Sequence, residues 1–195
     1  MKFLSPRILG IIGIIGAPWM FIDFVNNGLY EHFMLTPISG MRNFIFMAGW
    51  ICSVIGLYKL GAEGNKRLAR TILIIQLVLL LLAAIWSIMV MIAPNSPSKI
   101  FYALNFSWPL GGCFMVATGL VILLAKKLKG WKRFAPLLAG LWFPQTILIY
   151  AFTQNSVLLL MLSGIYSTIA FSLLGLAVAT ETDRSLITKA AAYKS

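Results

Sequence analysis

Long apolar runs separated by short polar stretches dominate the chain from one end to the other. Six runs can be drawn, at residues 8–27, 43–58, 71–93, 100–125, 134–152 and 156–180. A helix needs about 20 predominantly apolar residues to cross a bilayer core, and five of the runs have about that length. The run 43–58 is shorter, but the flanking Arg42 and Lys59 can extend their charged ends toward the headgroups while neighbouring residues complete the span. The pattern predicts an all-α integral membrane protein, a bundle of six transmembrane helices that forms one domain over residues 1–195.

Composition supports a bilayer as the solvent for most of the chain. Hydrophobic residues make up 60% of the sequence and charged residues only 11%, a balance that is not typical of water-soluble domains. The formal net charge of +11 comes from basic residues in short clusters between the apolar runs. Such clusters are typical of topology signals that face anionic membrane lipid, so we expect lipid and not nucleic acid as a partner.

The distribution of Lys and Arg predicts the orientation of the helices. Fourteen of the 16 basic residues lie before the first run, at 59–70, at 126–133 and after residue 180, which leaves only Arg42 and Lys99 elsewhere. Translocation of short basic loops is disfavoured, so we expect these four segments, and therefore both termini, to be cytoplasmic. The short, compact chain without organelle-targeting features favours a multi-pass protein of a prokaryotic cytoplasmic (inner) membrane.

Small residues on two of the runs predict the closest helix contacts. Lipid tails are as apolar as Leu, so membrane helices associate where small side chains let their backbones approach. The first run carries Gly10, Gly13 and Gly16, and the last carries a stripe of Gly164, Thr168, Ser172, Gly175 and Ala179. We expect these faces to pack inside the bundle, and the alternative is a docking surface for a partner subunit.

A few polar side chains in the outer halves or middles of the runs are candidates for a binding site. Ionisable groups within a membrane are expensive, and Asp23 is the main one here; it could bind a ligand or pair with Arg42. Asn105 and Ser107 lie in the outer half of the fourth run, and Gln145 lies near the middle of the fifth. These four side chains predict a ligand-binding cavity that faces outward between the first, fourth and fifth spans.

Aromatic-proline pairs occur beside these candidates. Pro18, Pro109 and Pro144 each adjoin an aromatic residue within an apolar run. Proline removes a backbone donor and clashes with the preceding turn, so each can kink its helix and expose carbonyl groups to a cavity. The other interpretation is that they only shape the bundle.

Three functions remain open from the sequence. The leading hypothesis is a membrane protein that binds or moves a small or lipidic ligand in the outward-facing cavity. The second is an enzyme that acts on lipid at the outer interface with Asp23, Glu31 and His32, and the third is a structural or regulatory partner subunit. The chain carries no recognised catalytic or metal-binding motif, so we assign no catalytic residue, metal or cofactor. Cys52 and Cys113 lie within apolar runs without a CxxC partner, and the oligomeric state is left open.

Overall fold

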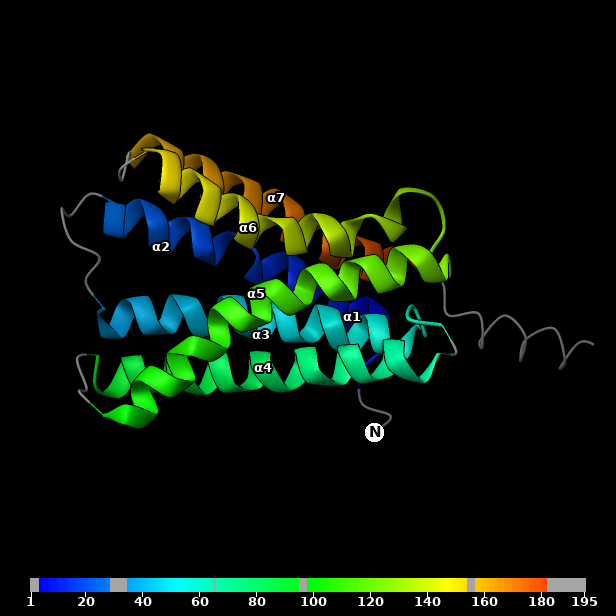
Figure 1. Ribbon diagram of the computed structural model, residues 1–195, viewed down its shortest axis with the longest axis horizontal. Coiled ribbons are helices and arrows are strands. Elements are labelled where there is room, and N and C mark those ends of the chain that lie inside the picture. Colours follow the sequence, from blue (N-terminus) through cyan, green and yellow to red (C-terminus); the bar gives the residue numbers. More distant parts are fainter. Residues whose placement is uncertain (1–3, 29–34, 65, 95–97, 154–156, 182–195) are drawn as a thin grey trace, which may run out of the picture.

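The helices of the chain lie along one common long axis (Figure 1). The structure, a computed structural model, describes residues 4–28, 35–64, 66–94, 98–153 and 157–181. The described residues form α1 (Pro6–Gly16), α2 (Pro18–Gly28), α3 (Pro37–Lys59), α4 (Arg67–Ile92), α5 (Lys99–Ala125), the 3-10 helix η1 (Gly130–Arg133), α6 (Ala135–Thr153) and α7 (Val157–Thr180), and no strand. The all-helical class predicted from the sequence is confirmed for this part of the chain.

Five segments within the described ranges are long and apolar enough to cross a membrane. They are Pro6–Asn26, Pro37–Lys59, Arg67–Ile92, Lys99–Ala125 and Met161–Thr180, and a shorter apolar helix covers Ala135–Ile149. The structure therefore contains five or six apolar helices that are compatible with a membrane bundle.

The helix boundaries differ most from the predicted runs at two places, and α4 also begins four residues earlier than predicted, at Arg67. The first run is divided at Ala17 into α1 and α2, because Pro18 has no N–H to continue the hydrogen bonding of α1. The second helix begins at Pro37 and not at Asn43, so Arg42 lies inside α3. This helix begins with a typical N-cap. Thr36 Oγ1 accepts a hydrogen bond of 3.0 Å from the Ser39 N–H, and a proline occupies the first turn.

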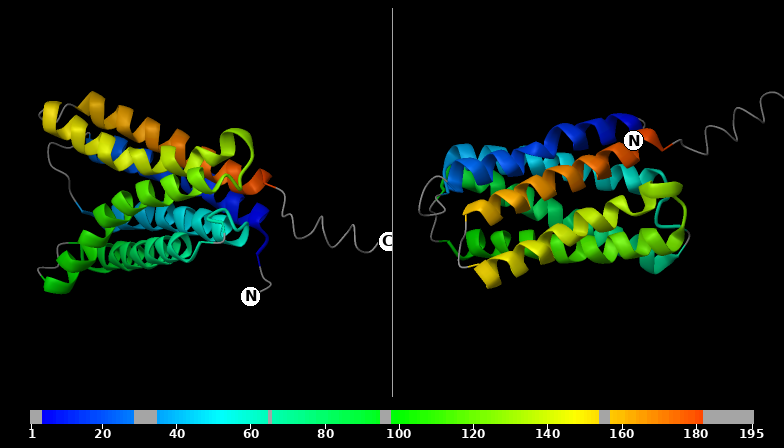
Figure 2. Two further views of the ribbon diagram at one scale, coloured as in Figure 1. Left: turned by 45° about the vertical axis from the view of Figure 1, so that its right-hand side comes forward. Right: turned by 90° about the horizontal axis from the view of Figure 1, so that it is seen from above.

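The helices form a ring in chain order. Each contacts the next one along the chain, α7 closes the ring against α1 and α2, and α3 also touches α7 across the middle. Figures 1 and 2 show that α1 begins and α7 ends at the same end of the bundle, where the α3–α4 and α5–α6 connections also lie. The last residues of α2, α4 and α6 and the first residues of α3, α5 and α7 lie at the opposite end.

Close backbone approach at glycines fixes the helix contacts. A Cβ on Gly10 would lie 2.4 Å from the Gly175 carbonyl oxygen, and one on Gly16 would lie 2.8 Å from the Gly49 Cα. The expected packing of the first and last helices inside the bundle is thus confirmed, with α3 as a further partner. The second close pair is α5 and α6, where a Cβ on Gly119 would lie 2.4 Å from the Leu137 Cα.

An aromatic cluster fills the middle of the ring. Phe171 on α7 makes edge-on contacts with Phe46 and Trp50 on α3, each with ring centroids 4.9 Å apart. Trp142 on α6 contacts this group and packs edge-on against Trp108 on α5, with centroids 5.2 Å apart. The cluster ties four helices together and separates the two ends of the bundle.

Candidate functional site

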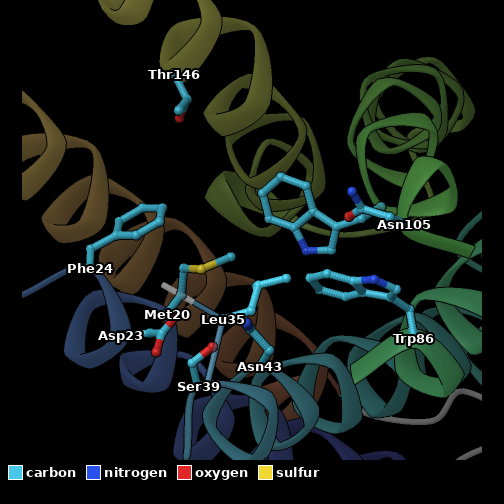
Figure 3. A pocket seen from close by; sticks show the side chains of 10 residues that line it. Met20, Asp23, Phe24, Leu35, Ser39, Asn43, Trp86, Asn105 and Thr146 are labelled. Carbon is cyan, nitrogen blue, oxygen red and sulfur yellow. The ribbon is translucent and has the colours of Figure 1, made fainter. Parts of the chain in front are cut away.

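A pocket of about 420 Å³ opens in the half of the bundle that lies opposite the start of α1 and the end of α7. Five helices contribute to its lining, together with Leu35, which precedes the Thr36 cap of α3. The helical residues are Met20, Asp23 and Phe24 from α2, Ser39 and Asn43 from α3, Trp86 from α4, Asn105 and Trp108 from α5, and Thr146 from α6. In Figure 3, Asp23, Ser39 and Asn43 group on one side and Trp86 and Asn105 face them from the other. We call this space the outer pocket.

The aromatic cluster closes the outer pocket toward the middle of the bundle. Trp108 belongs to both, since it lines the pocket and packs on Trp142. Along α3, Phe46 follows Asn43 by less than one turn, and along α6, Trp142 precedes Thr146 by about one turn. Trp142 and Phe46 are each only 1% exposed. The pocket therefore meets a layer of packed aromatic side chains on this side.

Asp23 and Arg42 form an ion pair at the edge of this pocket. Arg42 Nη1 lies 3.6 Å from Asp23 Oδ1, and the two side chains are 19% and 3% exposed. The pairing that the sequence suggested for Arg42 is present, although Arg42 reaches Asp23 from within α3. A buried carboxylate next to a cation costs less than an isolated one, so the pair explains how Asp23 is tolerated at this depth.

The structure brings together two of the four side chains predicted to form the site. Asp23 and Asn105 both line the outer pocket. Ser107 is buried outside the lining, and its hydroxyl donates to the Leu104 carbonyl on its own helix. Gln145 is also absent from the lining, where its neighbour Thr146 stands instead. Adjacent side chains on a helix point about 100° apart, so Thr146 can face the pocket while Gln145 faces away from it.

Helices α3 and α4 form walls of the pocket that were not predicted from the sequence. Ser39 and Asn43 come from the first two turns of α3, and Trp86 comes from α4, so the pocket is not confined to the first, fourth and fifth spans. Thr36 followed by Pro37 is a typical N-cap and first-turn signature, and it would have placed Ser39 on the helix. Trp86 is the one aromatic residue of α4, but a nearly continuous apolar run does not indicate which face of the helix meets a pocket.

Two buried polar atoms in the lining have no hydrogen-bond partner among the described residues. They are Nε1 of Trp86 and Oγ of Ser39, whose residues are 7% and 1% exposed. Leaving such a group unsatisfied costs about 1–3 kcal/mol, so buried donors generally find a partner. Pro109 also withholds the helical N–H that would reach the Asn105 carbonyl, which adds an acceptor on the same wall.

The other two sequence hypotheses have different outcomes. Glu31 and His32 lie outside the described residues, so their position relative to Asp23 is not part of the described geometry. In the described ranges, no group of three His, Cys, Asp or Glu side chains could hold a metal ion. The glycine faces of α1 and α7 cover each other, so a partner subunit could not dock on Gly10 or Gly175.

Comparison with known proteins does not assign the chain to a family or a function. No family model matches the chain, and the searches of curated proteins and of solved structures return no match.

Proposed function

We propose that the chain is a multi-pass protein of a prokaryotic cytoplasmic membrane with six spans and both termini in the cytoplasm. The nineteen residues of α6 extend about 28 Å at 1.5 Å per residue, close to the roughly 30 Å of a bilayer core, so α6 is long enough to be the sixth span. The connections at 60–66 and 126–134 carry most of the basic side chains of the loops and lie at the end where α1 begins and α7 ends. Under the positive-inside rule this end faces the cytoplasm, and the outer pocket faces outward.

In this orientation the protein binds or moves a small or lipidic ligand in the outer pocket. The observation that carries this proposal is the pair of unpartnered buried groups, Trp86 Nε1 and Ser39 Oγ, in the wall of a pocket of about 420 Å³. Ligand sites typically measure about 300–1,000 Å³ and combine apolar walls with a few polar groups. Trp86 can only donate, so the ligand presents an acceptor such as a carbonyl or hydroxyl oxygen to it.

Asp23 gives the opposite wall a different chemistry. Its carboxylate accepts hydrogen bonds, and Arg42 offsets its charge at 3.6 Å. A hydroxyl or amine of the ligand that approaches Asp23 would share the carboxylate with Arg42. The complementary ligand is therefore amphipathic, with an acceptor for Trp86, a donor for Asp23, and an apolar part against Met20 and Phe24.

Molecules that co-purify with the protein test this proposal. The protein is extracted in copolymer nanodiscs, and bound small molecules and lipids are measured per chain by mass spectrometry. Asn105→Phe places a bulky ring in the pocket, whereas Ala103→Phe places the same ring on an exposed position of the same helix outside the lining. We expect one molecule near 1:1 stoichiometry in the wild type and Ala103→Phe, and several-fold less in Asn105→Phe. Equal amounts in all three, or no molecule above the bulk lipid, would refute ligand binding here.

Thiol labelling tests the orientation independently. In a background with Cys52→Ala and Cys113→Ala, a membrane-impermeant reagent applied from outside should modify Asn105→Cys. It should reach Lys66→Cys and Lys129→Cys only after the membrane is permeabilised. Labelling of the two loop positions from opposite sides would exclude the six-span arrangement.

A further inference from the structure

A second pocket lies at the other end of the bundle, around the turn between α3 and α4. It has a volume of about 560 Å³ and is lined by Tyr58, Lys59, Gly61, Glu63, Gly64, Lys66, Arg67 and Arg70. The turn lies at the right-hand end of Figure 1, opposite the outer pocket. Four of these eight residues are cationic and one is a carboxylate, so we call it the basic pocket.

Glycine geometry and one fixed arginine hold the basic pocket in shape. Gly61 and Gly64 have φ angles of +61° and +74°, in the left-handed region that favours glycine. The Gly64 N–H donates to the Gly61 carbonyl at 3.0 Å and closes the turn. Arg70 Nε donates to the Tyr58 hydroxyl at 2.9 Å, and the guanidinium lies over the Tyr58 ring at 5.1 Å. The turn and the Arg70 wall are therefore preformed.

Two cations at the start of α4 are available to a ligand. Lys66 is the N-cap of α4 and Arg67 its first residue, and both are exposed. Within the described ranges, neither side chain has a hydrogen bond or an ion pair. The first N–H groups of a helix lack intrahelical acceptors and carry partial positive charge, which favours a phosphate-sized anion beside these side chains.

Glu63 supplies the observation that points to a particular ligand. The residue is only 6% exposed although it lines the pocket, and its Oε2 has no hydrogen-bond partner among the described residues. The lining as a whole attracts an anion, but the Glu63 carboxylate repels any phosphate oxygen placed directly against it. This carboxylate would accept a hydrogen bond from a hydroxyl attached to that phosphate, and this contact would satisfy the buried oxygen.

We propose that the basic pocket binds a phosphodiester whose alcohol carries a hydroxyl, as in a phosphoglycerol lipid headgroup. Lys66, Arg67 and the α4 N-terminus hold the phosphate, and Glu63 accepts from the headgroup hydroxyl. The net charge of the lining is +3, from four cations and one carboxylate, which selects an anionic headgroup over a zwitterionic one. The choice of a lipid over a soluble phosphodiester rests on the membrane orientation proposed above. The recognition of a hydroxylated phosphodiester follows from the residues of the pocket and is independent of that orientation.

Native mass spectrometry of the detergent-purified full chain tests the phosphate contact. Phosphatidylglycerol is titrated against the wild type, Lys66→Gln/Arg67→Gln and the control Lys126→Gln/Lys129→Gln, which removes two exposed lysines from the other basic connection. Each basic side chain near an anionic headgroup strengthens binding by about fivefold, so the first double variant should bind at least tenfold more weakly. The control should remain within twofold of the wild type. Equal losses in both variants would mean non-specific attraction and would overturn the proposal.

Glu63→Gln tests the recognition of the hydroxyl. The wild type should prefer phosphatidylglycerol to phosphatidic acid, which has no alcohol on its phosphate, and Glu63→Gln should lose most of that preference while retaining thermal stability. An unchanged preference would overturn the role of Glu63.

Soluble competitors identify the source of the phosphodiester. Glycerophosphoglycerol and inorganic phosphate are added at millimolar concentration to the lipid-bound protein. Retention of lipid supports the headgroup assignment. Displacement by glycerophosphoglycerol but not by inorganic phosphate supports the same chemistry with a soluble ligand, and equal displacement by both would overturn it. Thiol labelling of Lys66→Cys reports on the membrane orientation separately, so the two proposals can fail independently.

Discussion

Gly119 lies at one of the closest backbone approaches between α5 and α6, and Gly119→Ala should force the two helices apart there. An added Cβ would lie 2.4 Å from the Leu137 Cα and 2.6 Å from the Leu137 nitrogen, both of them backbone atoms that cannot rotate away. Ordinary contact begins at 3.4 Å, so the two helices must part locally by about 1 Å, the difference between 3.4 Å and 2.4 Å. Overpacking of this kind costs about 1–3 kcal/mol, against a helix-propensity gain of up to about 1 kcal/mol for Ala over Gly.

Gly111→Ala is the matched control, because it makes the same substitution at another buried glycine of α5. Its added Cβ would meet the Leu80 Cδ2 at 3.5 Å, which is an ordinary contact with the end of a flexible side chain. We expect Gly111→Ala to be neutral or up to about 1 kcal/mol more stable than the wild type. The two variants should therefore differ by about 2 kcal/mol although their chemistry is identical.

Reversible unfolding in mixed micelles of dodecyl maltoside and sodium dodecyl sulfate measures this difference. Tryptophan fluorescence is a suitable signal, because Trp108 on α5 and Trp142 on α6 pack against each other. Equal free energies of unfolding for Gly119→Ala and Gly111→Ala, within about 0.5 kcal/mol, would show that backbone approach does not control this helix pair.

Three further predictions concern polar side chains. Arg42→Gln should lower the free energy of unfolding by about 1–3 kcal/mol, because it leaves the Asp23 charge buried without its cation, and adding Asp23→Asn should restore part of the loss in the same assay. Burial raises the pKa of Glu63 above its ordinary value of 4.5, so the folded state holds the proton more tightly than the unfolded state. Stability should therefore fall as pH rises from 4.5 through the folded pKa. Thermal unfolding at a series of pH values should show a flatter profile for Glu63→Gln. The Thr146 hydroxyl lies 2.6 Å from the Ser163 hydroxyl across the α6–α7 contact. Thr146→Val should lower the free energy of unfolding by about 1 kcal/mol in a denaturant titration, and an unchanged free energy would contradict a stabilising role of this hydrogen bond.

Local sequence signals account for most of the difference between predicted and observed helix ends. Hydropathy is an average over many residues. The start predicted from it for the second helix was therefore Asn43, whereas the helix begins at Pro37. The Thr36 cap and the proline after it are a more specific signal, since they satisfy the free N–H groups of a first turn. The division at Ala17 follows from Pro18 in the same way.

The candidate site was only partly accessible from the sequence. Asp23 could be recognised because an ionisable group within an apolar run is rare and expensive, and Arg42 because it was the nearest cation on the same side. Ser107 and Gln145 have suitable chemistry and depth, but they lie outside the pocket lining. Trp86 and Ser39 carry the argument for a ligand, and their importance comes from unpartnered atoms that only coordinates reveal.

The sequence by itself determined that the chain is helical, that its helices are apolar and long, and where its basic side chains concentrate. These properties depend on the composition of contiguous segments, because a helix satisfies its backbone hydrogen bonds within one segment. The tertiary structure decided which faces meet and therefore which side chains share a pocket. Those outcomes depend on approaches of a few ångströms between segments far apart in the chain, such as Gly16 with Gly49 and Gly119 with Leu137. A hydropathy pattern does not predict such contacts, because it describes each segment separately.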